Sequence, residues 1–337
     1  MGCRRPTMFL CLVILGVLAV GPAFGQDDAN LQPAGAPLRM SDGSPNLQGM
    51  YTFRTITPMQ RPDALEGKVT LSAEEAAEFE ASENRRLNRD LFDPIEGAPS
   101  AGYAPRAEGG VLSYNEFWYE RGKELTRDKR TSLIVDPPDG KIPYTAAARE
   151  QNRITRANLS AGFADSYTDR SFADRCIMGF NSGPPMRPGA YNNNVLIMQT
   201  AGQVVIYNEM VHNARIIPMD SGPHGDLRQW VGDSRGRWEG DVLVIETTNF
   251  AYGTAFTGTT ADTKLVERLW RADPDTLLYE FTIEDQNSFT RPWTAMFPMR
   301  RTDGPLFEYA CHEGNYGMEG ILAGARNKNT QAVDRSR

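Results

Sequence analysis

Cys311, His312 and Glu313 form the most unusual run of reactive side chains in this sequence. A histidine and a carboxylate that are held rigidly can act together as a general acid and a general base. If Cys311 forms a disulfide, the bridge would fix the backbone beside His312 and Glu313 and would hold such a catalytic pair in place. The same bridge could equally serve only as a staple for the end of the chain, and we favour this second interpretation.

The chain has three histidines, His212, His224 and His312. Three protein ligands with an open fourth position are typical of a catalytic zinc site, so these side chains could converge in space, together with Glu313, around a metal. No pair of them has the spacing of zinc ligands along the sequence. The alternative is that each histidine forms a hydrogen bond with loop backbone.

Residues 232–236 (Gly-Asp-Ser-Arg-Gly) match the nucleophile elbow of α/β-hydrolases, in which a strand-to-helix turn lifts a serine hydroxyl toward an oxyanion hole. The flanking residues do not fit this motif, because no buried strand precedes it and a second strand, instead of a helix, follows it. We therefore expect a polar glycine turn at Ser234, and a serine hydrolase is the weaker alternative.

Some side chains combine positive charge or aromatic surface with a position in the β-rich part of the chain. The candidates for the lining of a ligand cavity are Arg187, Arg215, Arg237, Trp270 and Trp293. Three glutamates are further polar candidates, although a glutamate on a strand usually faces solvent: Glu246, Glu267 and Glu280. Because the mouths of β-barrels commonly hold small ligands, these residues suggest binding of a small, partly apolar molecule.

Residues 1–25 have the layout of a secretory signal peptide. Arg4 and Arg5 precede an apolar run at 8–20, and small residues lead to a cleavage position after Gly25. No other run is apolar enough to cross a bilayer, so we expect no membrane span in the mature chain and a periplasmic or secreted location. Loss of the two arginines makes the net charge more negative than −7. With no basic, aromatic stripe, we expect no nucleic-acid partner.

The signal peptide would also remove two of the four cysteines, Cys3 and Cys11. The two that remain, Cys176 and Cys311, are expected to form one disulfide because the compartment outside the cytoplasm is oxidising. The alternative is a pair of free thiols, with Cys311 reactive beside His312.

Strands must position most of these residues. Four pairs of alternating segments around turn residues predict hairpins: 195–207, 237–248, 263–284 and 293–310. Further strands are expected at 49–57, 111–119 and 131–135, helices at 72–89 and 145–156, and a closing helix or turn at 318–326. The first helix starts with a capping box of Ser72 and Glu75. The predicted fold class is therefore all-β dominated, an antiparallel meander that forms a barrel or a sandwich with a few peripheral helices.

The third hairpin contains an internal check of its register. If Arg271 faces Leu277, then Arg268 faces Glu280, and opposite charges come together. In the same register Trp270 faces Leu278, so apolar residues also come together.

Two long motifs resemble a widespread family of exported bacterial proteins to which no activity is assigned. They are WVGDSRGRWEGDVLVIETTNF at 230–250 and YACHEGNYGMEGILAGAR at 309–326, and the resemblance covers roughly residues 46–326. It implies export and a β-rich fold, and it transfers no catalytic residue and no cofactor. The chain departs from the family after Gly49, where the family usually has a tryptophan and this sequence has Met50 or Tyr51.

The predicted organisation is a signal peptide at 1–25, an extended lead-in at 26–48, one β-rich domain at 49–326 and a flexible tail at 327–337. Three functions are compatible with it. The first is a small-molecule binding protein. The second is a hydrolase or lyase that uses His312 and Glu313 or a three-histidine metal site. The third is a structural or interaction protein of the cell envelope.

Overall fold

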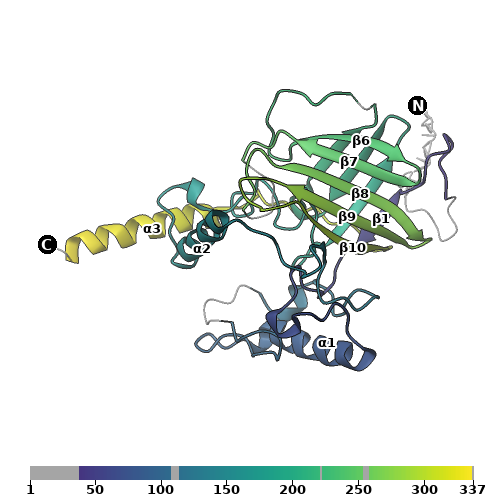
Figure 1. The fold of residues 1–337 in the computed structure, drawn as a ribbon. Helices are drawn as coiled ribbons and strands as arrows, with labels where there is room; N and C mark the ends of the chain where they lie inside the picture. Colours follow the sequence, from purple (N-terminus) through teal and green to yellow (C-terminus); the bar gives the residue numbers. More distant parts are fainter. Residues whose placement is uncertain (1–37, 108–113, 221, 253–257, 336–337) are drawn as a thin grey trace, which may run out of the picture.

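The chain folds into a ten-stranded antiparallel sheet that is nearly closed into a barrel (Figure 1). The computed structural model describes residues 38–107, 114–220, 222–252 and 258–335, with side chains as far as Lys328. The strands are β1 Gly49–Thr52, β2 Ile134–Asp136, β3 Asn194–Gln199, β4 Gln203–Asn208, β5 Ala214–Pro218, β6 Asp233–Glu239, β7 Val242–Thr248, β8 Lys264–Asp273, β9 Thr276–Glu284 and β10 Trp293–Arg301. Their order in the sheet is β5-β4-β3-β1-β10-β9-β8-β7-β6, and β2 pairs with β10 outside this path.

Two meanders build the sheet, and the first strand joins them. Strands β3 to β5 follow one another, as do β6 to β10, and β1 pairs with both β3 and β10. The first three predicted hairpins are confirmed as β3–β4, β6–β7 and β8–β9. The predicted register of the third is confirmed as well, since Arg268 pairs with Glu280 and Trp270 with Leu278.

A glycine allows the two ends of the sheet to meet. A Cβ atom on Gly236 of β6 would lie 2.9 Å from Cγ2 of Ile217 in β5, closer than a Cβ can approach another carbon. The missing side chain therefore lets β6 approach β5, and this approach brings the sheet close to a barrel.

The inward-facing positions of the strands are filled with buried side chains. Burial alternates along β8, β9 and β10, as it must when one face of each strand points into a barrel. The irregular segment 174–193 adds Met186, which is fully buried within the same core. The interior of the barrel is thus a packed core built from strands and one inserted loop residue.

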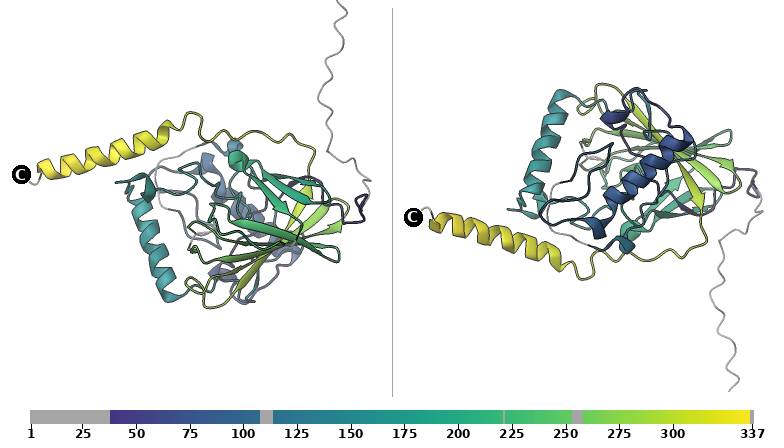
Figure 2. Two further views of the ribbon diagram at one scale, coloured as in Figure 1. Left: turned by 90° about the horizontal axis from the view of Figure 1, so that it is seen from above. Right: turned by 90° about the horizontal axis from the view of Figure 1, so that it is seen from below.

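The helices lie outside the barrel, as predicted (Figures 1 and 2). They are α1 Ala73–Leu87, α2 Ala146–Ser160 and α3 Tyr316–Arg335. The capping box at the start of α1 is confirmed, because Ser72 and Glu75 exchange side-chain to backbone hydrogen bonds. Helix α3 points away from the barrel and continues to Arg335, through most of the segment expected as a tail. No helix among the described residues is long and apolar enough to cross a membrane.

Two of the predicted strands are wrong. Residues 306–310 form no strand, because β10 already pairs with β9 along one edge and with β1 and β2 along the other, so no edge remains for a returning strand. In the predicted strand 111–119, residues 111–113 lie outside the described residues and Glu116–Trp118 form a 3-10 helix. Phe117 and Trp118 are both exposed, so the alternation of burial that a strand requires is absent.

Asp285, at the end of β9, organises the loops around it and gives a testable pH dependence. Its carboxylate accepts hydrogen bonds from the Thr260 amide at 2.6 Å, the Thr263 hydroxyl at 2.8 Å and the Asn287 amide at 3.0 Å. Burial alone raises the pKa of Asp285, but these hydrogen bonds outweigh it and hold the pKa below its ordinary value of 3.8. The carboxylate therefore contributes stability above pH 3.8, and this contribution is lost as the pH falls through the lower folded-state pKa.

Asp285→Asn is expected to lower the free energy of unfolding by about 1.5–3 kcal/mol at neutral pH, the usual value of hydrogen bonds to a charged group. The difference from the wild type should shrink below pH 3.8, which urea unfolding at about pH 7 and about pH 3 would measure. Asp303→Asn, at an exposed position, is the matched control. A difference that stays constant between the two pH values would contradict the assigned role.

Candidate functional site

A buried ion pair crosses the interior of the barrel. The Arg215 guanidinium of β5 donates to both carboxylate oxygens of Glu267 in β8, at 2.5 and 2.8 Å. The Tyr279 hydroxyl donates to Glu267 Oε1 at 2.5 Å and accepts from the Met186 amide at 3.1 Å. Burial raises the pKa of Tyr279 well above its ordinary value, and the Glu267 carboxylate adds to this effect. Arg215 is therefore engaged within the packed core and is not a free lining residue.

The other predicted lining residues do not surround one cavity. Trp293 is fully buried in the core, with ring contacts to Phe281 and Phe289. Arg237 lies on the outer face of β6 and pairs with Glu239 at 2.6 Å. The remaining two also lie apart: Trp270 on the outer face of β8, and Arg187 in the segment that follows Cys176.

The three histidines are not brought together. His212 Nδ1 lies 3.0 Å from the Tyr309 carbonyl oxygen, which is the loop-backbone contact named as the alternative. His224 lies between two carboxylates, with Nδ1 3.5 Å from Asp233 and Nε2 3.6 Å from Glu246. His312 is exposed. Within the described ranges no group of three or more His, Cys, Asp or Glu side chains could hold a metal, so the three-histidine site is not formed.

The predicted disulfide between Cys176 and Cys311 is confirmed, with Cα atoms 5.6 Å apart. It fastens the segment around Asp174 to the turn that precedes α3, and a hydrogen bond from Asn315 to the Asp174 carbonyl oxygen at 3.2 Å reinforces the connection. His312 and Glu313 are exposed on this turn. Their catalytic role stays a prediction.

Ser234 does not have the geometry of a nucleophile elbow. It is a residue of β6 whose side chain is buried inside the barrel, where its hydroxyl lies 2.8 Å from the Thr247 hydroxyl. The elbow requires a turn between a strand and a helix, whereas β7 is the next element here. The polar glycine turn expected at Ser234 is also wrong, because residues 233–239 form β6 and only Gly232, with φ at +70°, precedes the strand.

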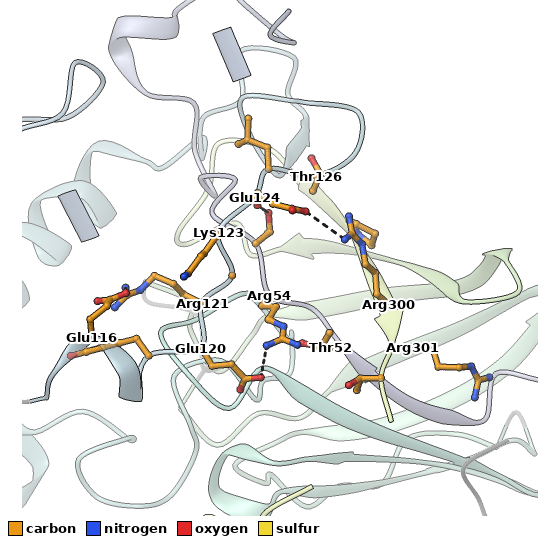
Figure 3. Close-up of a pocket in the computed structure, with 16 residues that line it drawn as sticks. Thr52, Arg54, Glu116, Glu120, Arg121, Lys123, Glu124, Thr126, Arg300 and Arg301 are labelled. Carbon is orange, nitrogen blue, oxygen red and sulfur yellow. Dashed lines mark hydrogen bonds and ion pairs between the residues drawn. The ribbon is translucent and has the colours of Figure 1, made fainter. Parts of the chain in front are cut away.

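A cavity of about 490 Å³ lies on the outer side of the barrel (Figure 3). Its walls are the outer faces of β1 and β10 and the segment 116–126. Gly122 makes this packing possible: with φ at +83°, a Cβ atom there would lie 3.1 Å from the backbone of Arg54 and Thr55. The segment also donates from the Glu120 amide to the Ala190 carbonyl oxygen, so backbone contacts hold it on both sides.

Charged side chains dominate the lining of this cavity, and most are paired. Figure 3 shows the ion pair of Arg54 with Glu120 at 2.8 Å and that of Arg300 with Glu124 at 3.8 Å. Arg121 pairs with Glu116 at 2.8 Å to one side of them.

Two further polar groups in the cavity lack such partners. Lys123 makes no side-chain ion pair within the described part of the chain. The Thr52 hydroxyl is buried and has no hydrogen-bond partner among the same residues. A buried polar atom without a partner costs free energy unless another molecule satisfies it.

A second cavity, of about 460 Å³, continues from the first and shares Arg54, Glu120 and Thr302 with it. We call the two together the Arg54 groove. The second part is more aromatic, with Trp118, Tyr191 and Phe307 in its walls. Trp118 and Phe307 are 61% and 64% exposed, so their ring faces are accessible to a ligand.

Two carboxylates meet where the cavities join. Asn194 donates to Glu209 Oε2 at 2.7 Å, and the Phe307 amide donates to Glu209 Oε1 at 3.1 Å. Burial raises the pKa of Glu120, Arg54 partly offsets this, and the Glu209 carboxylate raises it further. The groove thus combines cations, a carboxylate that takes up a proton more readily than usual, and accessible aromatic rings.

The sequence contains a signal for this groove. Residues 114–123 are rich in aromatic and charged side chains, and three aromatic residues follow one another at 117–119, which breaks the alternation of a strand. Arg54 and Arg300 give no signal of their own, because only the pairing of β1 with β10 brings them to the same cavity.

The fold and the groove define a nearly closed antiparallel β-barrel with an external polar and aromatic groove. No family model and no curated protein matches the chain. Among solved structures it is similar to the crystal structure of a mutant of the fluorescent protein UnaG, with 13% identity and a TM-score of 0.22, over 33% of this chain and 72% of that one. A similarity of this size transfers no ligand and no activity to this chain.

Proposed function

We propose that this protein is an exported binding protein that holds a small, partly apolar organic anion in the Arg54 groove. The strongest support is the groove itself, in which two adjoining cavities meet at the Arg54–Glu120 ion pair. Lys123 and Arg300 supply positive charge on one side, and Trp118 and Phe307 supply apolar surface on the other. The packed interior of the barrel makes this groove a better binding site than the barrel itself.

The chemistry of the lining selects the ligand class. Hydrogen bonds from ionised donors to an oxyanion are stronger than neutral ones, and Lys123 and Arg54 can both donate them. Aromatic rings contribute large apolar contact at little cost in conformational entropy, which favours a ligand with a flat or apolar body. An organic acid with an apolar end satisfies both parts of the groove.

A location outside the cytoplasm is part of the same proposal. Disulfides persist outside the cytoplasm, and the chain carries the Cys176–Cys311 bridge. Together with the signal-peptide layout of residues 1–25, the bridge supports a role in the periplasm or in the extracellular medium.

The probe for the test is 8-anilinonaphthalene-1-sulfonate, an aromatic anion whose fluorescence rises in an apolar site. Lys123→Gln and Trp118→Ala are each expected to weaken its binding about tenfold, the equivalent of about 1.4 kcal/mol. A fluorescence titration measures both the dissociation constant and the stoichiometry. In each variant the dissociation constant for the probe should rise and the stoichiometry should stay unchanged.

Matched controls are Lys328→Gln in exposed α3 and Trp270→Phe on the outer face of β8, which lie outside the groove. Organic acids that displace the probe from the wild type would then identify the ligand class. Equal affinity of the wild type, Lys123→Gln and Trp118→Ala for the probe would overturn the proposal.

A further inference from the structure

A separate cavity of about 360 Å³ lies beside α2 and shares no lining residue with the Arg54 groove. Its walls come mainly from residues 168–180, which include the disulfide-bonded Cys176 region, and from Thr155 and Leu159 of α2. Its volume lies within the range of small-molecule sites. We call it the arginine cavity because Arg170, Arg175 and Arg187 line it.

The three guanidinium groups are held by different contacts. Arg170 pairs with Asp174 through Nη2 at 3.1 Å, while its Nε is buried without a hydrogen-bond partner in the described part of the chain. Arg187 donates from Nε to the Phe180 carbonyl oxygen at 2.6 Å. Burial lowers the pKa of Arg187, so the positive charge is poorly solvated where it stands.

Arg175 is held by aromatic rings instead of carboxylates. Its guanidinium carbon lies 5.2 Å from the Tyr167 ring, 5.8 Å from the Phe172 ring and 5.8 Å from the Trp230 ring. Among the residues that the structure describes, it makes no ion pair. Cation–π contacts orient a guanidinium without using its N–H groups, which can then bind an oxyanion in the bidentate manner.

Aromatic rings continue from Arg175 along one side of the cavity. Phe172 meets Trp230 edge to face at 5.3 Å, and Trp230 stacks on Tyr252 at 5.2 Å. Phe172 and Tyr252 line the cavity directly. Of the lining side chains, Asp169 is the one acid against three arginines, so the local charge is positive although the whole chain is negative.

We infer that the arginine cavity is a second binding site, for a small carboxylate attached to a planar apolar body, such as an aromatic acid. The carboxylate takes the guanidinium edges of Arg175 and Arg170, and the ring lies against Phe172 and Tyr252. The Cys176–Cys311 bridge anchors the segment that carries these arginines and keeps the site formed in the free protein.

Benzoate is the probe, and isothermal titration and the fluorescence of Trp230 are the two readouts. Lys123→Gln, whose Arg54 groove is weakened, is expected to bind benzoate saturably in the arginine cavity, and the double variant Lys123→Gln, Arg175→Gln to bind it at least about tenfold more weakly, the loss of one charge-assisted contact. Trp230→Phe should abolish the change in fluorescence while the heat of binding persists. Arg153→Gln, on the exposed face of α2, is the matched control and should leave affinity unchanged.

Three outcomes would overturn the inference. They are absence of saturable binding to Lys123→Gln, equal affinity of the double variant and Lys123→Gln, and inorganic phosphate binding as tightly as benzoate, since the last would leave no role for the aromatic rings. Because Lys123→Gln alters only the Arg54 groove, saturable benzoate binding that persists in it separates this site from the proposed one. Thermal unfolding of each variant verifies that it is folded.

Discussion

Glu267→Gln is expected to lower the free energy of unfolding by about 3–5 kcal/mol, among the largest effects of any single substitution in this chain. The change leaves the Arg215 guanidinium buried inside the barrel without its counter-charge. Arg215 is 5% exposed and Glu267 is not exposed at all, so water cannot replace the lost partner. Urea unfolding of the wild type and the variant at neutral pH would measure the difference.

Replacing Arg215, Glu267 and Tyr279 together should lower the free energy of unfolding far less than replacing Glu267 alone. The triple variant Arg215→Met, Glu267→Leu, Tyr279→Phe replaces the polar groups with apolar ones of similar size, and such replacements are often neutral or stabilising. We expect its stability to lie within about 1–2 kcal/mol of the wild type, allowing for imperfect repacking.

The surface supplies the matched control. Glu239→Gln breaks the exposed pair of Arg237 and Glu239, and should change stability by less than about 1 kcal/mol. A Glu267→Gln variant as stable as this control would show that the buried pair does not anchor the barrel. A triple variant as unstable as Glu267→Gln would show that packing, and not an uncompensated charge, causes the loss.

Replacing both Cys176 and Cys311 with serine is expected to lower the free energy of unfolding by about 5 kcal/mol. The bridge joins residues 135 positions apart, and a cross-link over so long a loop removes much of the conformational freedom of the unfolded chain. The measurement is urea unfolding under oxidising conditions, where the wild type keeps its bridge.

Two comparisons isolate the contribution of the bridge. With reductant present, the wild type should have the same free energy of unfolding as the double variant. The free energy of unfolding of the double variant should not change when reductant is added. His312→Ala changes an exposed neighbour of Cys311 and leaves the bridge intact, so its effect should stay within about 0.5 kcal/mol. A loss of less than about 2 kcal/mol in the double variant would contradict the expected role of the bridge.

The hairpins could be predicted because their determinants are local. Alternation of apolar and polar residues and the turn at 272–276 fix the register of β8 and β9, so the pairing of Arg268 with Glu280 followed from the sequence. The fourth hairpin failed for a non-local reason. Whether 306–310 can pair depends on which edges of β10 are free, and β1 and β2 occupy the edge that it would need.

The candidate sites could be predicted only in part. Arg187 lines the arginine cavity, whereas its companions Arg170 and Arg175 are not among the predicted residues, and a ligand role for Arg187 stays a prediction. Arg215 and Trp293 carry the right chemistry for a ligand site, yet both are buried in the core. Residue type cannot separate these cases, because burial depends on contacts between strands that are distant in sequence.

The sequence by itself determined the strands of the first three hairpins, the capping box of α1 and the two cysteines that form the disulfide. The first two rest on neighbouring residues, and the third rests on only two cysteines lying outside the predicted signal peptide. The tertiary structure alone decided that Arg215 meets Glu267 across the barrel and that Arg54 and Glu120, 66 residues apart, meet at the groove. The physical reason is that β1 enters the sheet between β3 and β10 and that Gly122 lets segment 116–126 lie against it, and neither contact leaves a periodic signal in the sequence.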